Sequence, residues 1–277
     1  MTAPSLAAMP ADNSPSPSKG TLYLVPTPLD FGCAAEHQHA IEDILPAHTL
    51  QIACELTHWI TENAKSTRAF LKRVNAHRPL KLVLQSHHMV ELPREVHKKG
   101  DHAGNPGMAF DARPLLAPAL AGHNMGLTSE AGMPAVADPG SSVVRAAHAL
   151  GIPVQVMTGP SSLLLALAAS GMNGQQFAFV GYLPQDGISR ANRLRELETL
   201  ALKAGQTQIF IETPYRNTAL LHTALQTLKP QTRLAVSCGL MVGTPQRPVH
   251  FSTTVSAWRA CKPSLDWSLP TVFLIGV

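Results

Sequence analysis

Short apolar runs alternate with helix-length amphipathic stretches along most of the chain. The first apolar run, Thr21–Val25, predicts a strand, and Pro26 and Pro28 end it because proline cannot continue a central sheet ladder. The pattern after residue 46 predicts a helix from Ala47, a strand at His58–Thr61, a helix from Ala64 to about Asn75, a long surface connection over Ser86–Gly107 and a helical run near Arg113–Ala121. This alternation is typical of an α/β protein.

The stretch from residue 125 to residue 171 has the most regular pattern. Asp138 suits the N-cap of a helix and Pro139 its first turn, while Gly151 and Gly171 suit helix ends. The predicted order is a buried strand at Met125–Ser129, a loop at 130–140, a helix at Ser141–Leu150, a strand at Ile152–Met157, a tight loop at 158–162 and a helix at Leu163–Ser170. This order of strand, loop and helix predicts a parallel sheet.

Three special loops follow predicted strands of that sheet. They are the Pro26–Pro28 turn, the Gly- and Pro-rich loop at 130–140, and the Ser161–Ser162 loop. Ligands of parallel sheets bind beyond the carboxyl ends of the strands. We therefore expect the three loops to lie on one edge and to form one ligand site.

The pattern changes after Gly171 and predicts a second sheet. The expected elements are strands at Phe177–Gly181, Gln208–Glu212, Arg233–Cys238, His250–Val255 and Thr271–Ile275, with helices at Ser189–Ala204 and Pro214–Leu228. Proline-rich connections at 245–248 and 263–270 favour antiparallel edge strands. The sequence thus predicts a flexible Pro- and Ser-rich tail at 1–20, an N-terminal α/β domain at 21–157 with a mainly parallel sheet, and a C-terminal α/β domain at 158–277 with a mixed sheet.

Composition adds limits on function. A chain of 277 residues suits two domains, and its net charge of +4 permits an anionic partner without demanding one. The 5% aromatic content is low for a dedicated nucleic-acid-binding module. No apolar run approaches the roughly 20 residues of a membrane helix, and the start of the chain is unlike a signal peptide. The cysteines lack CxxC spacing, so we expect reduced thiols in a cytoplasmic protein; they are Cys33, Cys54, Cys238 and Cys261.

Five segments, in order, resemble the tetrapyrrole methylase superfamily, nearest to the branch that includes ribosomal small-subunit RNA methyltransferase I. They are Gly20–Pro28 (GTLYLVPTP), Thr128–Gly140 (TSEAGMPAVADPG), Thr158–Gly171 (TGPSSLLLALAASG), Phe177–Pro184 (FAFVGYLP) and Ile209–Arg216 (IFIETPYR). The chain has no GxGxxG turn after its first strand, which disfavours a Rossmann-type methyltransferase.

The resemblance implies a two-domain methyltransferase, usually a homodimer, that binds S-adenosylmethionine in the cleft between its domains. It implies cofactor contacts from the first-strand loop, the loop after Ser129, the serine loop and the second domain. The residues expected to bind the cofactor are Pro28, Glu130, Met133, Pro134, Val136, Ala137, Gly159, Pro160, Ser161, Ser162, Tyr182, Leu183, Ile211, Cys238, Pro270 and Thr271.

The chain departs from the RNA-methylating branch at four places. A PIGNL-type turn is replaced by Pro28–Gly32, an aspartate by Glu130, an acidic Glu-Asp-Thr-Arg-like stretch by Thr61–Arg68, and a Glu-Leu-Thr-Lys stretch by Cys238–Met241. These changes fall where the methyl acceptor would bind. Three hypotheses therefore stay open: methyl transfer to RNA, on a ribose hydroxyl; methyl transfer to a tetrapyrrole or another small molecule; and a cofactor-binding sensor or scaffold without turnover.

The loop residues have structural interpretations beside the functional ones. Glu130 is expected to contact the ammonium or ribose hydroxyls of the cofactor, and the alternative is a cap on nearby backbone amides. Gly132 and Pro134 shape the loop under either interpretation. Ser161 and Ser162 open a helix, where we expect one serine to cap the helix and the other to contact the ligand.

Other polar groups favour structural roles. We expect solvated histidines and no metal site, because loop histidines at loose spacing rarely provide metal geometry; the cluster concerned is His87, His88, His97 and His102. Two basic groups are interpreted as solvated helix faces, with phosphate binding as the alternative; they are Lys65, Arg68, Lys72 and Arg73, and Arg190, Arg193 and Arg195. An activated methyl donor needs no fixed catalytic triad, so no catalytic residue is assigned. Glu62, Tyr182 and Tyr215 are candidates for work on the acceptor side.

Overall fold

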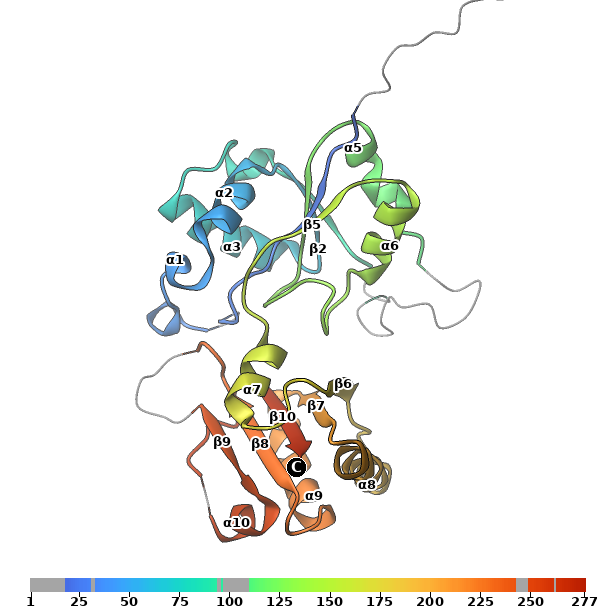
Figure 1. Ribbon diagram of the computed structural model, residues 1–277. Helices are drawn as coiled ribbons and strands as arrows, with labels where there is room; N and C mark the ends of the chain where they lie inside the picture. Colours follow the sequence, from blue (N-terminus) through green and yellow to red (C-terminus); the bar gives the residue numbers. More distant parts are fainter. Residues whose placement is uncertain (1–17, 31–32, 94–95, 97–109, 243–248, 262) are drawn as a thin grey trace, which may run out of the picture.

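The computed structural model describes residues 18–30, 33–93, 96, 110–242, 249–261 and 263–277. Figure 1 shows two α/β parts, one containing the first five strands and the other the last five. The chain passes from one part to the other at residues 157–161, between β5 (Val154–Val156) and α7 (Ser162–Ser170). The predicted flexible tail lies almost wholly outside the described residues.

The first sheet is parallel throughout, as predicted. Its order is β3-β2-β4-β1-β5. The strands besides β5 are β1 (Leu22–Leu24), β2 (His58–Thr61), β3 (His88–Glu91) and β4 (Met125–Thr128).

Helices cover both faces of this sheet because its central strands are apolar on both sides. Trp59 packs with α2 and α3 on one face, and Ile60, its neighbour in β2, packs with α6 on the other. The helices are α1 (Ile41–Ile44), α2 (Ala47–Glu55), α3 (Ala64–His77), α5 (Ala117–Leu120) and α6 (Ser141–Ala149), with 3-10 turns at Ala35–His37, Leu84–Ser86 and Arg113–Leu116.

The second sheet is mixed, with the order β6-β7-β10-β8-β9. Only its β6–β7 pair is parallel among the pairings of these strands. The strands are β6 (Phe177–Tyr182), β7 (Thr207–Glu212), β8 (Arg233–Cys238), β9 (His250–Thr254) and β10 (Thr271–Gly276). Both sheets thus have the expected character, which confirms the predicted fold class.

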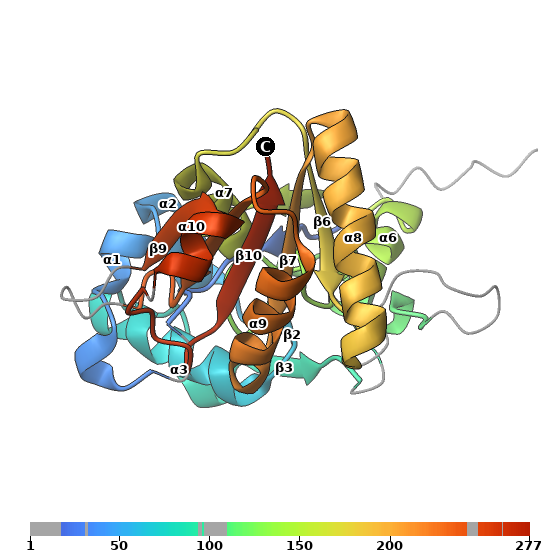
Figure 2. The ribbon, with the colours of Figure 1, turned by 90° about the horizontal axis from the view of Figure 1, so that it is seen from below.

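Helices on the second sheet separate into an outer and an inner layer. Figure 2 shows α8 (Gly187–Ala204) and α9 (Asn217–Thr227) over one face, where Phe210 and Phe273 stack with ring centroids 5.8 Å apart. A 3-10 turn at Pro214–Arg216 precedes α9, and α10 (Val255–Ala260) completes this layer. On the other face α7 packs Leu163 and Leu167 against the sheet. The amino end of α7 thereby reaches the space between the two sheets (Figure 1).

Three predicted elements need correction. The stretch expected to be a surface connection contains β3, whose side chains are largely exposed because it is an edge strand, so it lacks a hydrophobic pattern. Gly140, with φ 135°, occupies the N-cap of α6 that was assigned to Asp138. The connection at 263–270 leads into β10, which lies in the centre of its sheet instead of at an edge; residues 245–248 lie outside the described residues.

The histidines near the amino ends of β2, β3 and β4 are not simply solvated, contrary to the prediction. The His58 ring stacks between those of His88 and His123, with centroids 4.8 Å away on each side. Buried His87 accepts a hydrogen bond from the Trp59 indole at 3.2 Å. Burial, followed by the neighbouring histidines, lowers the pKa of His58. His97 and His102 lie outside the described residues.

Two arginines of the expected solvated faces are instead structural. Arg190 is buried in α8, where its guanidinium donates to the carbonyl oxygens of Pro184 and Gln185. Arg73 forms a two-bond ion pair with buried Asp30, with N–O distances of 2.8 and 3.1 Å. The hydrophobic periodicity of the sequence could not reveal the partners of these two arginines, because the partners lie in loops.

Candidate functional site

A cavity of about 220 Å³ lies between the two sheets. The first part of the chain contributes Leu29 and the loop after β4, and the second contributes the start of α7, the ends of β6, β7 and β8, and the start of β10. Its wall is formed by Leu29, Ala131, Gly132, Met133, Val136, Ala137, Asp138, Ser161, Ser162, Leu163, Tyr182, Ile211, Glu212, Gly239, Leu240, Val242, Pro270, Thr271 and Val272. Most of this wall is apolar, with polar groups at a few places, as is usual for a small-molecule site.

The loop between β4 and α6 is held in an unusual backbone conformation. Gly132 pairs with Thr27 through two backbone hydrogen bonds of 3.0 Å, which join this loop to the one after β1. Ala135 and Ala137 have φ of 64° and 66°, in the left-handed region that costs about 1–2 kcal/mol for residues with a Cβ. Met241, between the wall residues Leu240 and Val242, is also left-handed. Such strain is concentrated in proteins at sites where the backbone itself faces a ligand.

Three carboxylates gather on the first-sheet side of the cavity. The Glu62 carboxylate, which follows β2, accepts a hydrogen bond from the Glu130 backbone N–H at 3.1 Å. Partial burial, then Glu62 and then Glu130, raises the pKa of Asp138 to about 8. The three groups repel one another when ionised, so the site favours either a proton or a bound cation. We call Glu62, Glu130 and Asp138 the acidic group.

A fourth carboxylate comes from the second sheet. Buried Glu212 lines the cavity, and its Oε1 accepts hydrogen bonds from the Arg216 guanidinium at 2.8–2.9 Å and from the Thr213 N–H at 2.7 Å. Its Oε2 is buried and has no partner among the described atoms. A buried acceptor without a donor costs about 1–3 kcal/mol, so this oxygen suits a hydroxyl or ammonium donor from a ligand.

The start of α7 supplies free donors and hydroxyls. Ser161 is the N-cap of α7, yet its side chain makes no capping hydrogen bond. No side-chain hydrogen bond of Ser162 is found within the described structure either, so the expected capping by one of the two serines is wrong. Both residues line the cavity, next to helix N–H groups that have no intrahelical partner.

A second pocket of about 570 Å³ adjoins the cavity. Pro28 and Glu130 line this pocket, while their chain neighbours Leu29 and Ala131 line the cavity. The other residues of the pocket wall are Thr27, Asp30, Cys33, Gln38, Asn63, Lys65, Ser66, Ala69, Phe70, Lys72 and Arg73. We call this space the lysine pocket.

The structure distributes the sixteen predicted cofactor residues over several environments. The cavity wall includes Met133, Val136, Ala137, Ser161, Ser162, Tyr182, Ile211, Pro270 and Thr271. Pro28 and Glu130 face the lysine pocket, and the others are in neither wall: Pro134, Gly159, Pro160, Leu183 and Cys238.

Packing explains several of the residues outside both walls. Leu183 belongs to the core under α8, and Cys238 accepts a hydrogen bond from the Thr271 hydroxyl at 3.3 Å. At Gly159 a Cβ would come within 2.3 Å of the Pro26 ring, so this glycine allows the two loops to touch.

The three residues considered for work on the methyl acceptor lie in different environments. Glu62 belongs to the acidic group and Tyr182 lines the cavity, where partial burial, then Asp138 and Glu212, raise its pKa. Tyr215 is 81% exposed and lies outside both pockets, with its ring beneath the Arg216 guanidinium.

Sequence reasoning missed Asp138 and Glu212 as site residues. Asp138 had the pattern of a helix cap, and Glu212 ends a strand of the other domain.

Comparison with known proteins gives the chain a family. The sequence profile of the Tetrapyrrole (Corrin/Porphyrin) Methylases matches residues 62–250, well over half of the 277 residues. The chain belongs to this family. The methyltransferase CobJ has a similar fold, with a TM-score of 0.51 at 16% identity, over 93% of this chain and 94% of that chain.

Curated relatives of this tetrapyrrole methylase carry the name ribosomal RNA small subunit methyltransferase I. The protein from Xylella fastidiosa is 32% identical over 221 residues, which are 78% of this chain and 67% of that protein. The protein from Halalkalibacterium halodurans is 33% identical over 200 residues, which are 72% of this chain and 57% of that protein. The chain therefore spans between about half and two thirds of these relatives.

In the described ranges, no three or more His, Cys, Asp or Glu side chains are grouped so that they could hold a metal ion. None of the helices described above has both the length and the apolar character needed to cross a lipid bilayer.

Proposed function

We propose that this tetrapyrrole methylase transfers a methyl group from S-adenosylmethionine to small-subunit ribosomal RNA, on a ribose 2'-hydroxyl. The single observation that supports it most is the cavity whose wall joins Asp138 of the acidic group, the start of α7 and Glu212. The names of the relatives support the RNA acceptor, and the net charge of +4 agrees with an anionic partner.

The residues of the cavity fit this cofactor. Apolar side chains such as Met133, Ile211 and Leu240 suit the adenine ring. The unpartnered Oε2 of Glu212 and the uncapped serine hydroxyls suit the ribose and the amino acid end of the cofactor. Asp138 suits its positive charge, because a bound cation relieves the repulsion within the acidic group.

In this reaction the protein mainly has to position the reactants and shield them from water. When bound, the cofactor supplies a methyl group that is already activated on a sulfonium sulfur. Glu130 belongs to the acidic group and also lines the lysine pocket, so its carboxylate is placed to accept the proton of an acceptor hydroxyl that enters from that pocket. Asp138 faces the cavity and holds the positive charge.

Labelled methyl transfer tests the proposal. Purified protein is incubated with methyl-labelled S-adenosylmethionine and with small ribosomal subunits or naked small-subunit RNA from a strain that lacks this methyltransferase. We expect label in the RNA, at a ribose found by nuclease digestion and mass spectrometry. Glu130→Gln should lower kcat roughly 100-fold or more, an effect much larger than the change in cofactor affinity that follows from removing one charge of the acidic group.

Other outcomes would replace the proposal. Methylation of a uroporphyrinogen-type acceptor, with none of RNA, would favour a small-molecule enzyme. Tight cofactor binding with no transfer to any cellular fraction would favour a sensor or scaffold.

We also propose that the domains meet near residue 157, that the protein is cytoplasmic and that it acts as a homodimer. Light scattering at working concentration measures the last of these.

A further inference from the structure

The lysine pocket contains two positively charged side chains that pair with no other group in the described structure. Lys65 and Lys72 lie on α3, line the pocket and are exposed, and neither ammonium has a hydrogen-bond or ion-pair partner within the described part of the chain. Seven residues separate them, so they lie about 10 Å apart along the helix. Two unpaired cations at this separation suit a ligand with repeated negative charges better than a single carboxylate.

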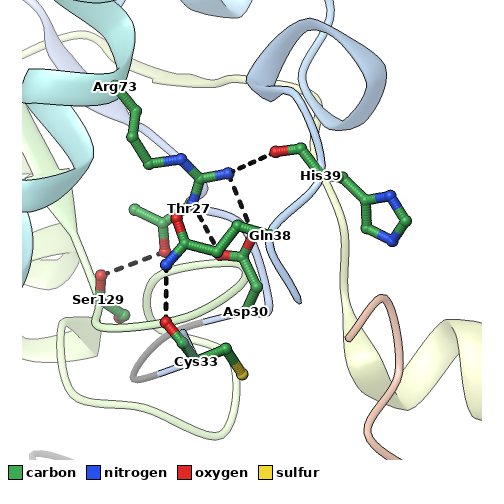
Figure 3. A network of polar contacts seen from close by, with 7 residues as sticks. All are labelled: Thr27, Asp30, Cys33, Gln38, His39, Arg73 and Ser129. Carbon is green, nitrogen blue, oxygen red and sulfur yellow. Dashed lines mark hydrogen bonds and ion pairs between the residues drawn. The ribbon is translucent and has the colours of Figure 1, made fainter. Parts of the chain in front are cut away.

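Apart from Glu130, the other charged groups of the pocket wall, Asp30 and Arg73, pair with each other. Figure 3 shows the Arg73 guanidinium between the Asp30 carboxylate and the His39 carbonyl, which it contacts at 2.9 Å. Gln38 donates to the Cys33 carbonyl at 2.9 Å, and Asn63 caps α3 by accepting from the Lys65 and Ser66 N–H groups. The Arg73 contacts thus join α3 to Asp30 and His39, and these polar groups are already occupied within the protein.

The position of the pocket relates it to the reaction. Its wall and that of the cavity meet at Pro28–Leu29 and again at Glu130–Ala131, on the two loops joined by the Thr27–Gly132 pairing. A polymeric ligand bound in the pocket would therefore lie next to the cavity, with Glu130 at the boundary between the two spaces.

We propose that the lysine pocket binds the phosphodiester backbone of the RNA acceptor, with Lys65 and Lys72 contacting separate phosphates while the acceptor nucleotide passes Glu130 toward the cavity. This inference rests on the proposed function and deepens it. It also reverses the interpretation of these two lysines as parts of a merely solvated helix face.

Charge-removal variants of the full-length protein test the inference. Lys65→Ala, Lys72→Ala and the double variant are compared with two controls: Arg68→Ala, on the same helix but outside the pocket wall, and Lys203→Ala, exposed near the end of α8. The measurements are the KM and the Kd for transcribed small-subunit RNA as a function of salt, and the Kd for S-adenosylmethionine by calorimetry.

Each pocket variant should weaken RNA binding about five- to tenfold and reduce the salt slope by about one, since each phosphate contact releases about one counterion. Cofactor affinity should stay unchanged in all variants, and the controls should bind RNA within about twofold of the wild type. Lys72→Arg should restore most of the RNA affinity lost in Lys72→Ala.

Failure of the pocket and failure of the proposed function give different results. If the wild type methylates RNA and the double variant matches it in KM and salt slope, the lysine pocket is not the RNA site. If equal losses occur in the controls, the charge acts through a diffuse field and the pocket assignment is wrong. If the wild type neither binds nor methylates RNA, the proposed function itself fails; lysine-dependent KM values for a uroporphyrinogen-type acceptor would then assign the pocket to a polycarboxylate.

Discussion

The ionisation of Asp138 depends on what occupies the cavity. Without a ligand, its burial and its two carboxylate neighbours hold a proton on it up to a pH of about 8. A cation placed beside it favours the ionised form, so cation binding and proton release are linked. The charge of Asp138 is therefore expected to change when a cation binds in the cavity.

The affinity for S-adenosylmethionine should accordingly increase with pH. Asp138 is ionised only above its raised pKa, so the Kd should fall about tenfold between pH 7 and pH 9 in the wild type. In Asp138→Asn the affinity should be lower at high pH, and only the titration of the ligand itself should remain. Calorimetry of both proteins across this range checks the prediction, and equal pH profiles would contradict it.

At the level of single residues, the sequence could predict the loops but not the charge network. Ser161 and Ser162 could be identified because they stand at the start of an apolar helix, and both line the cavity. The raised pKa of Asp138 depends on Glu62, 76 positions earlier in the chain, and on Glu130, eight positions earlier. No local sequence pattern shows that residues so far apart along the chain lie close together in space.

At the level of elements, amphipathic helices and buried strands were predictable and exposed edges were not. α7 and β4 have apolar patterns that identify them directly. β3 pairs with β2 along four residues, but its exposed side chains lack the periodicity that burial imposes. β3 is identified by its backbone pairing with β2, which the sequence pattern does not show.

The stability of the protein should decrease in acid because of the histidines at the amino ends of β2 and β3. The pKa of His58 is lowered from 6.5 in the folded chain, so the unfolded chain binds a proton more readily. This contribution to stability is therefore present above pH 6.5 and is lost as the pH falls through the folded pKa. His58→Phe, which retains a ring between His88 and His123, should show a shallower decline of Tm below pH 6.5 than the wild type.

Thermal unfolding between pH 5 and pH 8 measures this effect. His148→Phe, on the exposed surface of α6, is the control that removes one imidazole without touching the stack. A steep decline that persists in His58→Phe and vanishes in the control would contradict the assignment.

At the level of the whole molecule, the cavity depends on both sheets at once. The rule that parallel sheets bind ligands at their carboxyl edge was enough to bring the three loops together. It says nothing about a second sheet, so Glu212, Gly239 and Val242 could not be found from the first domain. They enter the site because the strand ends of the second sheet face the loops of the first sheet around the cavity.

Cofactor binding should therefore stabilise segments from both parts of the molecule. At a ligand concentration 100 times the Kd, the gain is about 2.7 kcal/mol in the free energy of unfolding. Hydrogen exchange should slow in residues 133–138, 161–163 and 239–242, and should change little at residues 65–72 until RNA is added. Protection confined to one sheet would contradict a site shared by both.

The acidic group has a consequence for turnover under the proposed function. The donor would be positively charged and its product neutral, so the carboxylates of Glu62, Glu130 and Asp138 would lose the charge that offsets their mutual repulsion. The site then holds its product less tightly than its substrate, and taking up a proton on Asp138 restores the resting state. Under the proposed function, the loss of the positive charge therefore favours release of the demethylated cofactor.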